Sequence, residues 1–122
     1  MEKHILLIDD DPDEIDIFLD ALRSKGMDVK CSTVNSAEEA MKFLQRIMPD
    51  YIVLDYKMPK TDGIECLANI KALPHLSHIP VIMYSSTMND EDIKTAMIVG
   101  AAGHIKKPFD MRTLALLLQP FL

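Results

Sequence analysis

Short apolar runs alternate with stripes of helical period five times along the chain, and no other feature of the sequence constrains the fold as much. The runs are predicted strands at 4–8, 27–34, 51–55, 81–85 and 103–107. Each is followed by a segment whose apolar residues recur at helical spacing. Such alternation is typical of a parallel sheet that helices cover on both faces. We therefore predict an α/β fold, a doubly wound five-stranded parallel sheet, in one domain that spans residues 1–122.

Capping residues mark where the predicted helices begin. Asp11 directly precedes a proline and a helical stripe, which is typical of an N-cap. Predicted caps of the second and fourth helices are Ser36 with Glu39, and Asn89 or Asp90. Residues 56–63, YKMPKTDG, are predicted to form a loop.

The chain is acidic, with 19 acidic residues against 13 basic ones and a formal net charge of −6. Its summed field repels nucleic acid and anionic membrane surfaces, so direct binding to either is not expected. No apolar stretch is long enough to cross a bilayer, and the N-terminus lacks the pattern of a signal peptide. Cys31 and Cys66 have no metal-ligand spacing and are expected to be reduced. We predict a cytoplasmic protein.

Polar side chains follow four of the predicted strands. They are Asp9 and Asp10 after the first, Asp55 after the third, Ser85 and Ser86 after the fourth, and Lys107 after the fifth. The carboxyl ends of parallel strands share one edge of a sheet, where open α/β folds bind their ligands. Adjacent carboxylates repel one another unless a cation lies among them, and oxygen ligands suit a hard ion such as Mg²⁺. A helix cap explains Asp11 but not Asp9 and Asp10, so we predict a Mg²⁺ site at this edge.

Four motifs resemble those of the receiver domain of two-component response regulators. ILLIDDDP, VLDYKMPKTDG, PVIMYSS and HIKKPF occur in the family's order and span nearly the whole chain. The resemblance implies a (βα)5 flavodoxin-like fold with strand order 2-1-3-4-5. It also implies a phosphorylation-dependent signalling protein of a two-component phosphorelay, in which an aspartyl phosphate switches a protein-interaction surface. Such a chain catalyses only its own phosphotransfer and dephosphorylation, and is not otherwise an enzyme.

The resemblance also assigns the phosphoryl and metal sites. Asp55 matches the phosphoacceptor, and Asp9 and Asp10 match the acidic pair that holds Mg²⁺ together with Asp55. Lys57 matches the ligand that binds the ion through its backbone carbonyl. A carboxylate is a weak nucleophile, so its attack on phosphorus needs cations that neutralise the phosphoryl oxygens. When metal is absent, we expect the Lys57 side chain to pair with an acid of the pocket.

Ser85, Lys107 and His104 match positions that respond to phosphorylation in the family. The Ser85 hydroxyl matches the switch residue. This hydroxyl and the Lys107 ammonium would form hydrogen bonds to the new phosphoryl oxygens, and their loops would move toward Asp55. The resemblance implies a cis bond before Pro108. His104 stands where many receivers carry an aromatic residue that moves on activation. Two interpretations of it stay open: part of the output surface, or an ordinary edge-strand histidine.

The fifth helix, predicted to begin at Asp110, carries more apolar residues than one buried face needs. Its core stripe is Met111, Leu114, Leu118 and Phe121. Leu116 and Leu117 extend the apolar surface, which fits a partner or a homodimer through the fourth helix, fifth strand and fifth helix, and equally fits an overfilled terminal helix. No effector segment follows, so we expect a stand-alone, chemotaxis-type receiver. Its expected partners are a sensor histidine kinase or histidine phosphotransfer protein, and a downstream target protein.

Two other functions compete with this one. The acidic run after the first strand contains the Asp-x-Asp of Mg²⁺-dependent phosphohydrolases of the haloacid-dehalogenase type, with Asp9 as nucleophile, although the chain is short for that class. The other alternative is a receiver-like binding module that phosphorylation does not regulate. The complete set of strand-end residues argues against the second alternative.

Overall fold

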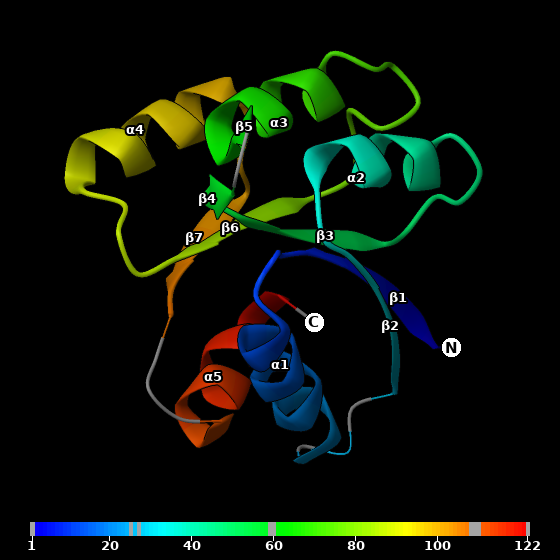
Figure 1. Cartoon of the computed structure of the whole chain (residues 1–122), viewed down its shortest axis with the longest axis vertical. Coiled ribbons are helices and arrows are strands. Elements are labelled where there is room, and N and C mark those ends of the chain that lie inside the picture. The colour runs from blue at the N-terminus through cyan, green and yellow to red at the C-terminus, as the bar shows by residue number, and fades with distance from the viewer. Residues whose placement is uncertain (1, 25, 27, 59–60, 108–110, 122) are drawn as a thin grey trace.

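Five parallel strands form the central sheet, in the order β2-β1-β3-β6-β7 (Figure 1). The structure is a computed structural model that describes residues 2–24, 26, 28–58, 61–107 and 111–121. The strands are β1 (Lys3–Ile8), β2 (Val29–Val34), β3 (Tyr51–Asp55), β6 (Val81–Ser85) and β7 (Gly103–Lys106). In chain order these are the first to fifth strands of the sheet. The predicted order 2-1-3-4-5 is therefore confirmed, and β3 is the central strand.

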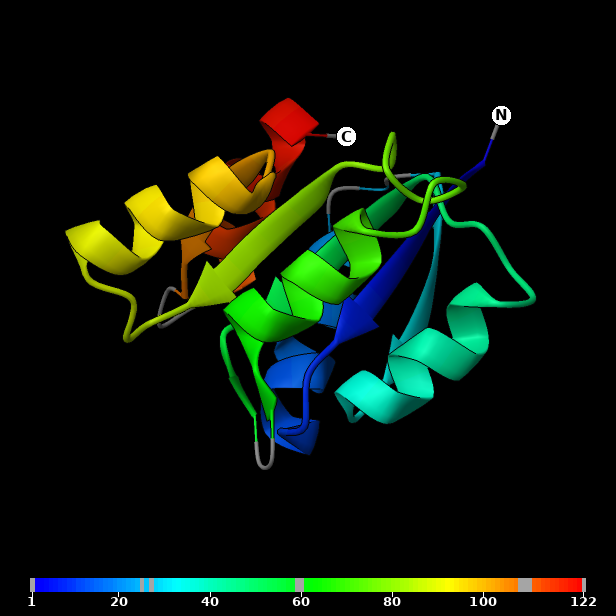
Figure 2. The same cartoon turned by 90° about the horizontal axis from the view of Figure 1, so that it is seen from above.

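Helices cover both faces of this sheet, as the doubly wound prediction requires (Figures 1 and 2). Helices α1 (Pro12–Ser24) and α5 (Met111–Leu118) lie together on one face, and a 3-10 turn, η1 (Gln119–Phe121), follows α5. The other face carries α2 (Ala37–Leu44), α3 (Gly63–Lys71) and α4 (Asp90–Val99). Both faces of the sheet are thus shielded from water. This explains why the strands read as nearly continuous apolar runs.

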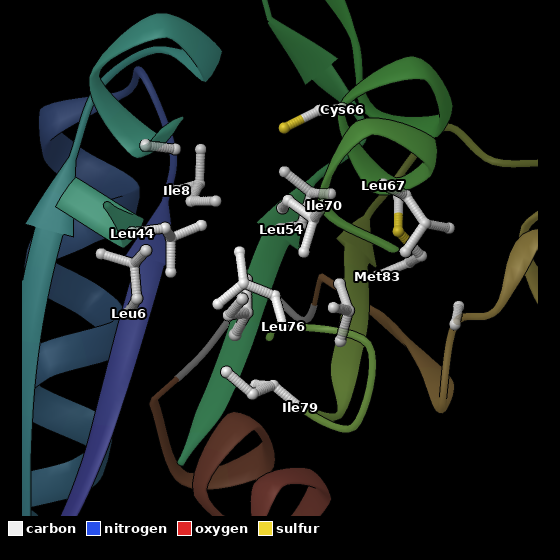
Figure 3. Packing of buried hydrophobic residues seen from close by; sticks show 14 of the residues in the cluster. Leu6, Ile8, Leu44, Leu54, Cys66, Leu67, Ile70, Leu76, Ile79 and Met83 are labelled. Carbon is white, nitrogen blue, oxygen red and sulfur yellow. The ribbon is translucent and has the colours of Figure 1, made fainter. Parts of the chain in front are cut away.

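Alternate residues of β1 supply the two cores. Leu6 and Ile8 belong to the cluster under α2 and α3, where they pack with residues such as Leu54 and Leu67 (Figure 3). The intervening residues of the strand point to the other face, where Leu7 packs in the cluster under α1 and α5. All of these side chains are fully buried. Core packing on both faces therefore fixes the end of β1, directly before the acidic residues 9–11.

The predicted caps are present at the first two helices. The Asp11 side chain accepts a hydrogen bond from the backbone amide of Asp13 at 2.9 Å. The Ser36 side chain accepts one from the amide of Glu39 at 3.1 Å. Side-chain oxygens at these positions satisfy helix amides that have no partner within the helix. The Asp11 cap also begins α1 soon after β1 ends, which places the first turn of α1 over the sheet edge.

At the start of helix α4, the structure distinguishes between the two predicted N-caps, Asn89 and Asp90. Asn89 is the N-cap, and it forms a reciprocal capping box with Asp92. The helix ends at Gly100, whose φ of 130° lies in a region that residues with a Cβ rarely adopt. Asp90 is therefore the first helical residue, not the cap. The connection from β6 to α4, which carries Ser86 and Thr87, is fixed at its helical end.

The expected loop at residues 56–63 is partly wrong, because it contains a small hairpin. Strands β4 (Lys57–Met58) and β5 (Thr61–Asp62) pair antiparallel directly after Asp55. At the base of the hairpin, the Gly63 amide donates a hydrogen bond to the Tyr56 carbonyl at 2.7 Å. Two-residue strands are too short to show a period in the sequence. The cis bond predicted before Pro108 and the helix start predicted at Asp110 lie outside the described residues.

Candidate functional site

The carboxyl ends of β1, β3, β6 and β7 meet at one edge of the sheet, and the predicted polar residues come together there. Asp9, Asp55 and Ser85 are the buried polar residues in the described part of the chain. Lys107 follows β7, and its side chain is only 11% exposed. A pocket of about 230 Å³ opens at this edge; it is lined by Asp10, Asp11, Glu14, Asp55, Lys57, Ser85, Ser86, Thr87 and Lys107.

The Lys107 ammonium lies among three carboxylates. Its Nζ is 3.1 Å from Asp55 Oδ1 and 3.4 Å from Asp9 Oδ2, and it also contacts Glu14 Oε2. The same Nζ lies 4.9 Å from the centre of the Tyr84 ring, which adds a cation–π contact. One ammonium thus serves residues from β1, α1 and β3. Lys107 is the electrostatic centre of the site.

The charges of the site shift one another's pKa values. Burial raises the pKa of Asp9 to about 6, although the hydrogen bond from the Asp11 amide and the Lys107 charge lower it. Burial also raises the pKa of Asp55, against the opposing effect of Lys107. Burial lowers the pKa of Lys107, but the hydrogen bond to Glu14 and the charges of Asp55 and Asp9 outweigh it, so that pKa is raised. Three carboxylates around one ammonium leave an excess of negative charge.

A divalent cation would balance the excess negative charge of the site and would find carboxylate oxygens there as ligands. Carboxylate oxygens of Asp9, Glu14 and Asp55 lie within 4.8 Å of one another. Hard cations such as Mg²⁺ prefer oxygen ligands and keep several waters, for which the pocket has room. Asp10, the predicted partner of Asp9, lines the same pocket but is not among these three. The residues present fit a Mg²⁺ ion.

Glu14 is the residue of the site that the sequence-based prediction missed. It lies in the first turn of α1, where an acidic residue is already explained by the positive end of the helix dipole. Its spacing from Asp9 matches no common ligand pattern. The available signal was the Asp11 cap, because a helix that starts at Pro12 places the Glu14 of its first turn beside the sheet edge.

Ser85 is held by the loop that follows β6. Its Oγ accepts a hydrogen bond from the Thr87 amide at 2.9 Å and lies 3.2 Å from the Thr87 hydroxyl. The Ser85 carbonyl accepts a hydrogen bond from the Lys107 amide at 3.1 Å. The backbone therefore links the Ser85 and Lys107 strand ends, and the Ser85 side chain lines the pocket that Asp55 also lines.

The expected pairing of the Lys57 side chain with an acid of the pocket is wrong. Lys57 is exposed, and within the described residues its ammonium makes no ion pair with these acids. Lys107 neutralises the acids instead, because it follows β7 at the same edge of the sheet and is shielded from water. The contact of Lys57 with the site is through its backbone, whose amide lies 3.5 Å from Asp55 Oδ1.

His104 lies on β7, the edge strand, and is half-buried. Its Nε2 is buried, and it has no hydrogen-bond partner among the residues that the structure describes. Burial lowers the pKa of His104; a hydrogen bond to the Ser85 backbone raises it, and the Lys106 charge lowers it. The contact with Ser85 places His104 beside the strand end that carries the predicted switch hydroxyl.

Exposed apolar side chains gather on the helices next to β7. Met97 and Ile98 of α4 are 46% and 78% exposed, and Leu116 and Leu117 of α5 are 53% and 40% exposed. The excess apolar residues predicted on the fifth helix are therefore at the surface. The predicted core residues Leu114 and Leu118 are fully buried. Separately, none of the helices in the described segments has the length and apolar character needed to cross a bilayer.

Comparison with known proteins gives one consistent result. Residues 5–119 match the response regulator receiver domain family. The chain is 34% identical over 110 residues to chemotaxis protein CheY-3 of Vibrio cholerae, covering 90% of this chain and 84% of that protein. This chain covers very different shares of its other curated relatives, from 90% of their length to 23%.

Solved structures agree with this result. The phosphorylated cyanobacterial phytochrome response regulator RcpA is similar, with a TM-score of 0.88 and 30% identity over 99% of this chain and 91% of that one. The Mn²⁺-bound form of response regulator Rcp1 has a TM-score of 0.85 and 28% identity over 98% and 91% of the two chains. The sheet order, the acidic strand ends and these matches lead to one conclusion. The chain belongs to the response regulator receiver domain family, and it is a phosphorylation-dependent signalling domain of two-component systems.

Proposed function

We propose that Asp55 accepts the phosphoryl group and that Asp9, Asp10, Asp55 and the backbone carbonyl of Lys57 hold the Mg²⁺ that this reaction needs. The observation that carries the proposal is the position of Asp55. It ends the central strand, lines the pocket and lies 3.1 Å from the Lys107 ammonium. The similar response regulator Rcp1 has a Mn²⁺-bound form, which supports the binding of a divalent ion by this chain.

The reaction is an in-line transfer of the phosphoryl group to a carboxylate oxygen of Asp55, from an imidazole nitrogen of a phosphohistidine donor or from an oxygen of acetyl phosphate. An Asp55 carboxylate oxygen bonds to the phosphorus of the donor, the bond from phosphorus to the donor's leaving atom breaks, and the leaving group keeps that electron pair. The product is an aspartyl phosphate. Bound Mg²⁺ would neutralise part of the phosphoryl charge, and the Lys107 ammonium would add to this from the end of β7 at the same edge of the sheet. The chain would catalyse this transfer and its own dephosphorylation, in which water releases inorganic phosphate and restores the Asp55 carboxylate, and no other reaction.

The burial of Asp9 argues against the hydrolase alternative. Asp9 has no exposed surface and does not line the pocket, whereas Asp55 does. One oxygen of Asp9 accepts the Asp11 amide at 3.0 Å and the other faces Lys107 at 3.4 Å. A nucleophile must reach the phosphorus of its substrate, and Asp55, which lines the pocket, is better placed to do so than Asp9, whose oxygens are both engaged within the fold.

Ser85 and Lys107 would convert the phosphoryl group into a change of shape. The hydroxyl of Ser85 is engaged with Thr87 and can turn instead to a phosphoryl oxygen. Lys107 can exchange a carboxylate partner for another phosphoryl oxygen. Because His104 is linked to the Ser85 backbone, the movement would reach the surface of α4, β7 and α5.

The partners follow from this chemistry. The donor would be a sensor histidine kinase or a histidine phosphotransfer protein in the cytoplasm, and the receiver would occupy residues 1–122. The exposed apolar side chains of α4 and α5 support a downstream target protein, or a homodimer, that binds at one or both of these helices. The net charge of −6 favours neither nucleic acid nor membrane as a direct partner.

Phosphorylation by a small donor tests the assignment. Wild type, Asp55→Asn, Asp9→Asn and the control Asp13→Asn are incubated with acetyl phosphate, with Mg²⁺ or with EDTA, and their intact masses are recorded. We expect one Mg²⁺-dependent phosphoryl adduct in wild type and in Asp13→Asn, and none in Asp55→Asn. An adduct that survives in Asp55→Asn but is lost in Asp9→Asn would favour the hydrolase. No adduct in wild type, with acetyl phosphate or with histidine kinases as donors, would favour the unregulated binding module.

A further inference from the structure

Glu14 contacts the Lys107 ammonium from the first turn of α1. Of the three acids around Lys107 it is the most exposed, with 34% of its side chain open, against 0% for Asp9 and 6% for Asp55. Glu14 also lines the pocket together with Asp55 and Lys107. The other two acids are fixed at strand ends, whereas Glu14 approaches from a helix on one face of the sheet.

Lys107 and a divalent cation would compete for the same oxygens. Lys107 Nζ is paired with Asp9 Oδ2 and Asp55 Oδ1. The other oxygen of Asp9 is already committed to the Asp11 amide at 3.0 Å. Neutralisation of Asp9 and Asp55 by an incoming cation therefore removes two of the three partners of Lys107, and like charge then repels the ammonium. Glu14 is the partner that remains.

We propose that Glu14 is a positioning residue for Lys107: it holds the ammonium beside the pocket once Asp9 and Asp55 are taken by metal, so that Lys107 is in place for the phosphoryl group. This inference rests on the proposed function and adds a residue to it. A charge-assisted hydrogen bond to an ammonium that is itself largely shielded from water is strong enough to hold a flexible lysine in one place. Glu14 transfers no atoms; it acts through Lys107.

The sign of the rate change separates this role from a simple charge effect. Loss of a negative charge beside the pocket should, by electrostatics alone, speed the reaction with an anionic phosphodonor. Loss of a positioning contact should slow it. At saturating Mg²⁺, established by titration for each variant, we expect Glu14→Gln to slow phosphorylation by acetyl phosphate about three- to tenfold. Asp13→Asn removes an exposed acid from the same helical turn and should stay within about twofold of wild type.

The position of Lys107 can be read directly. With ¹⁵N-labelled lysine, the Lys107 ammonium of the Mg²⁺-saturated protein should give a protected NMR signal in wild type and in Asp13→Asn. That signal should be lost through fast solvent exchange in Glu14→Gln. Glu14→Asp keeps the charge but shortens the side chain, and should recover little of the protection. A protected Lys107 signal in Glu14→Gln would overturn the proposal.

A double-mutant cycle asks whether Glu14 acts through Lys107. In a Lys107→Met background, Glu14→Gln should cause no further slowing. Equal slowing in both backgrounds would make Glu14 a metal ligand in its own right and would overturn the proposal. Should Lys107→Met not fold, the NMR signal decides alone. A wild type without an adduct on Asp55 contradicts the proposed function, whereas normal phosphorylation together with a protected Lys107 in Glu14→Gln contradicts only this inference.

Discussion

Lys107 Nζ lies 3.1 Å from Asp55 Oδ1, and this contact joins residues that are 52 positions apart in the chain. Both side chains are nearly removed from water, with exposures of 11% and 6%. The pair ties the end of β7 to the end of the central strand. It therefore contributes to stability as well as to the chemistry of the site.

Removal of the ammonium should destabilise the metal-free protein strongly. Lys107→Met leaves the buried carboxylates of Asp9 and Asp55 without a counter-charge, which should lower the free energy of unfolding by about 3 kcal/mol or more. Urea unfolding in EDTA measures the loss, and added Mg²⁺ should restore part of it. Lys42→Met is the control, because Lys42 is exposed and pairs with Glu38 at 3.5 Å on the surface of α2; its cost should be below about 1 kcal/mol. Equal losses in the two variants would contradict the argument.

The stability of the metal-free protein should depend on pH through Asp9. Burial raises the pKa of Asp9 from its ordinary 3.8 to about 6. Between these values the folded state binds the proton and the unfolded state does not, so this residue's contribution to stability falls as the pH rises from about 4 to 6. Asp9→Asn cannot ionise and should gain stability relative to wild type over that range. Urea unfolding in EDTA at pH 4, 5, 6 and 7 tests this, with the exposed Asp20→Asn as control; parallel curves for wild type and Asp9→Asn would contradict it.

The sequence predicts the elements of the fold well, because local rules determine them. Apolar runs bounded by caps indicated the five strands, and the Asp11 and Ser36 caps are where the sequence placed them. The order of the strands is a different matter. Alternation of strands and helices is compatible with several orders, and only the family resemblance implied 2-1-3-4-5.

The site is predicted less completely, because side-chain pairing depends on distances between elements. The strand-end rule brings Asp55, Ser85 and Lys107 together, and they do meet. The rule does not apply to Glu14, which reaches the site from a helix. It also does not decide which lysine neutralises the acids: Lys57 is adjacent to the site in sequence but exposed, whereas Lys107 is shielded. The β4–β5 hairpin was missed because two-residue strands carry no period.

Gly63 should be required for the placement of Asp55. A Cβ at Gly63 would lie 2.6 Å from Tyr56 Cα and 2.8 Å from the Asp55 carbonyl oxygen, which are backbone atoms that cannot turn aside. We expect Gly63→Ala to lower the free energy of unfolding by about 1–3 kcal/mol and to slow phosphorylation, because the segment after β3 must shift. Gly26→Ala is the matched control, since Gly26 has a φ of +60° but a Cβ at that position would meet nothing within 4 Å. Its cost should be about 1 kcal/mol with no effect on phosphorylation; equal effects on phosphorylation would refute the link to Asp55.

The unpaired nitrogen of His104 should cost stability. Its Nε2 is buried with no hydrogen-bond partner among the described residues, and a buried polar atom without a partner is unfavourable. His104→Phe replaces that nitrogen with carbon in a ring of similar shape but also removes the hydrogen bond to the Ser85 backbone. An unpaired buried polar group costs about 1–3 kcal/mol and a hydrogen bond contributes about 0.5–1.5 kcal/mol, so the free energy of unfolding should rise by no more than about 1 kcal/mol. His78→Phe, at an exposed position, should change it by less than about 0.5 kcal/mol. A loss of stability in His104→Phe, measured by urea unfolding at pH 7.5, would contradict the prediction and would show that the hydrogen bond to Ser85 outweighs the cost of the unpaired nitrogen.

The exposed apolar face of α4 should serve binding and not folding. Ile98 is 78% exposed, so Ile98→Ser should leave the free energy of unfolding and the rate of phosphorylation nearly unchanged. Association of the phosphorylated chain, with itself in analytical ultracentrifugation or with a target protein in a pull-down from labelled candidates, should be weakened. Ile47→Ser is the control, because Ile47 is 40% exposed in the connection between α2 and β3, away from this face. If both variants associate as wild type does, the apolar side chains of α4 are ordinary surface residues; a loss confined to Ile98→Ser assigns them to the interface that phosphorylation controls.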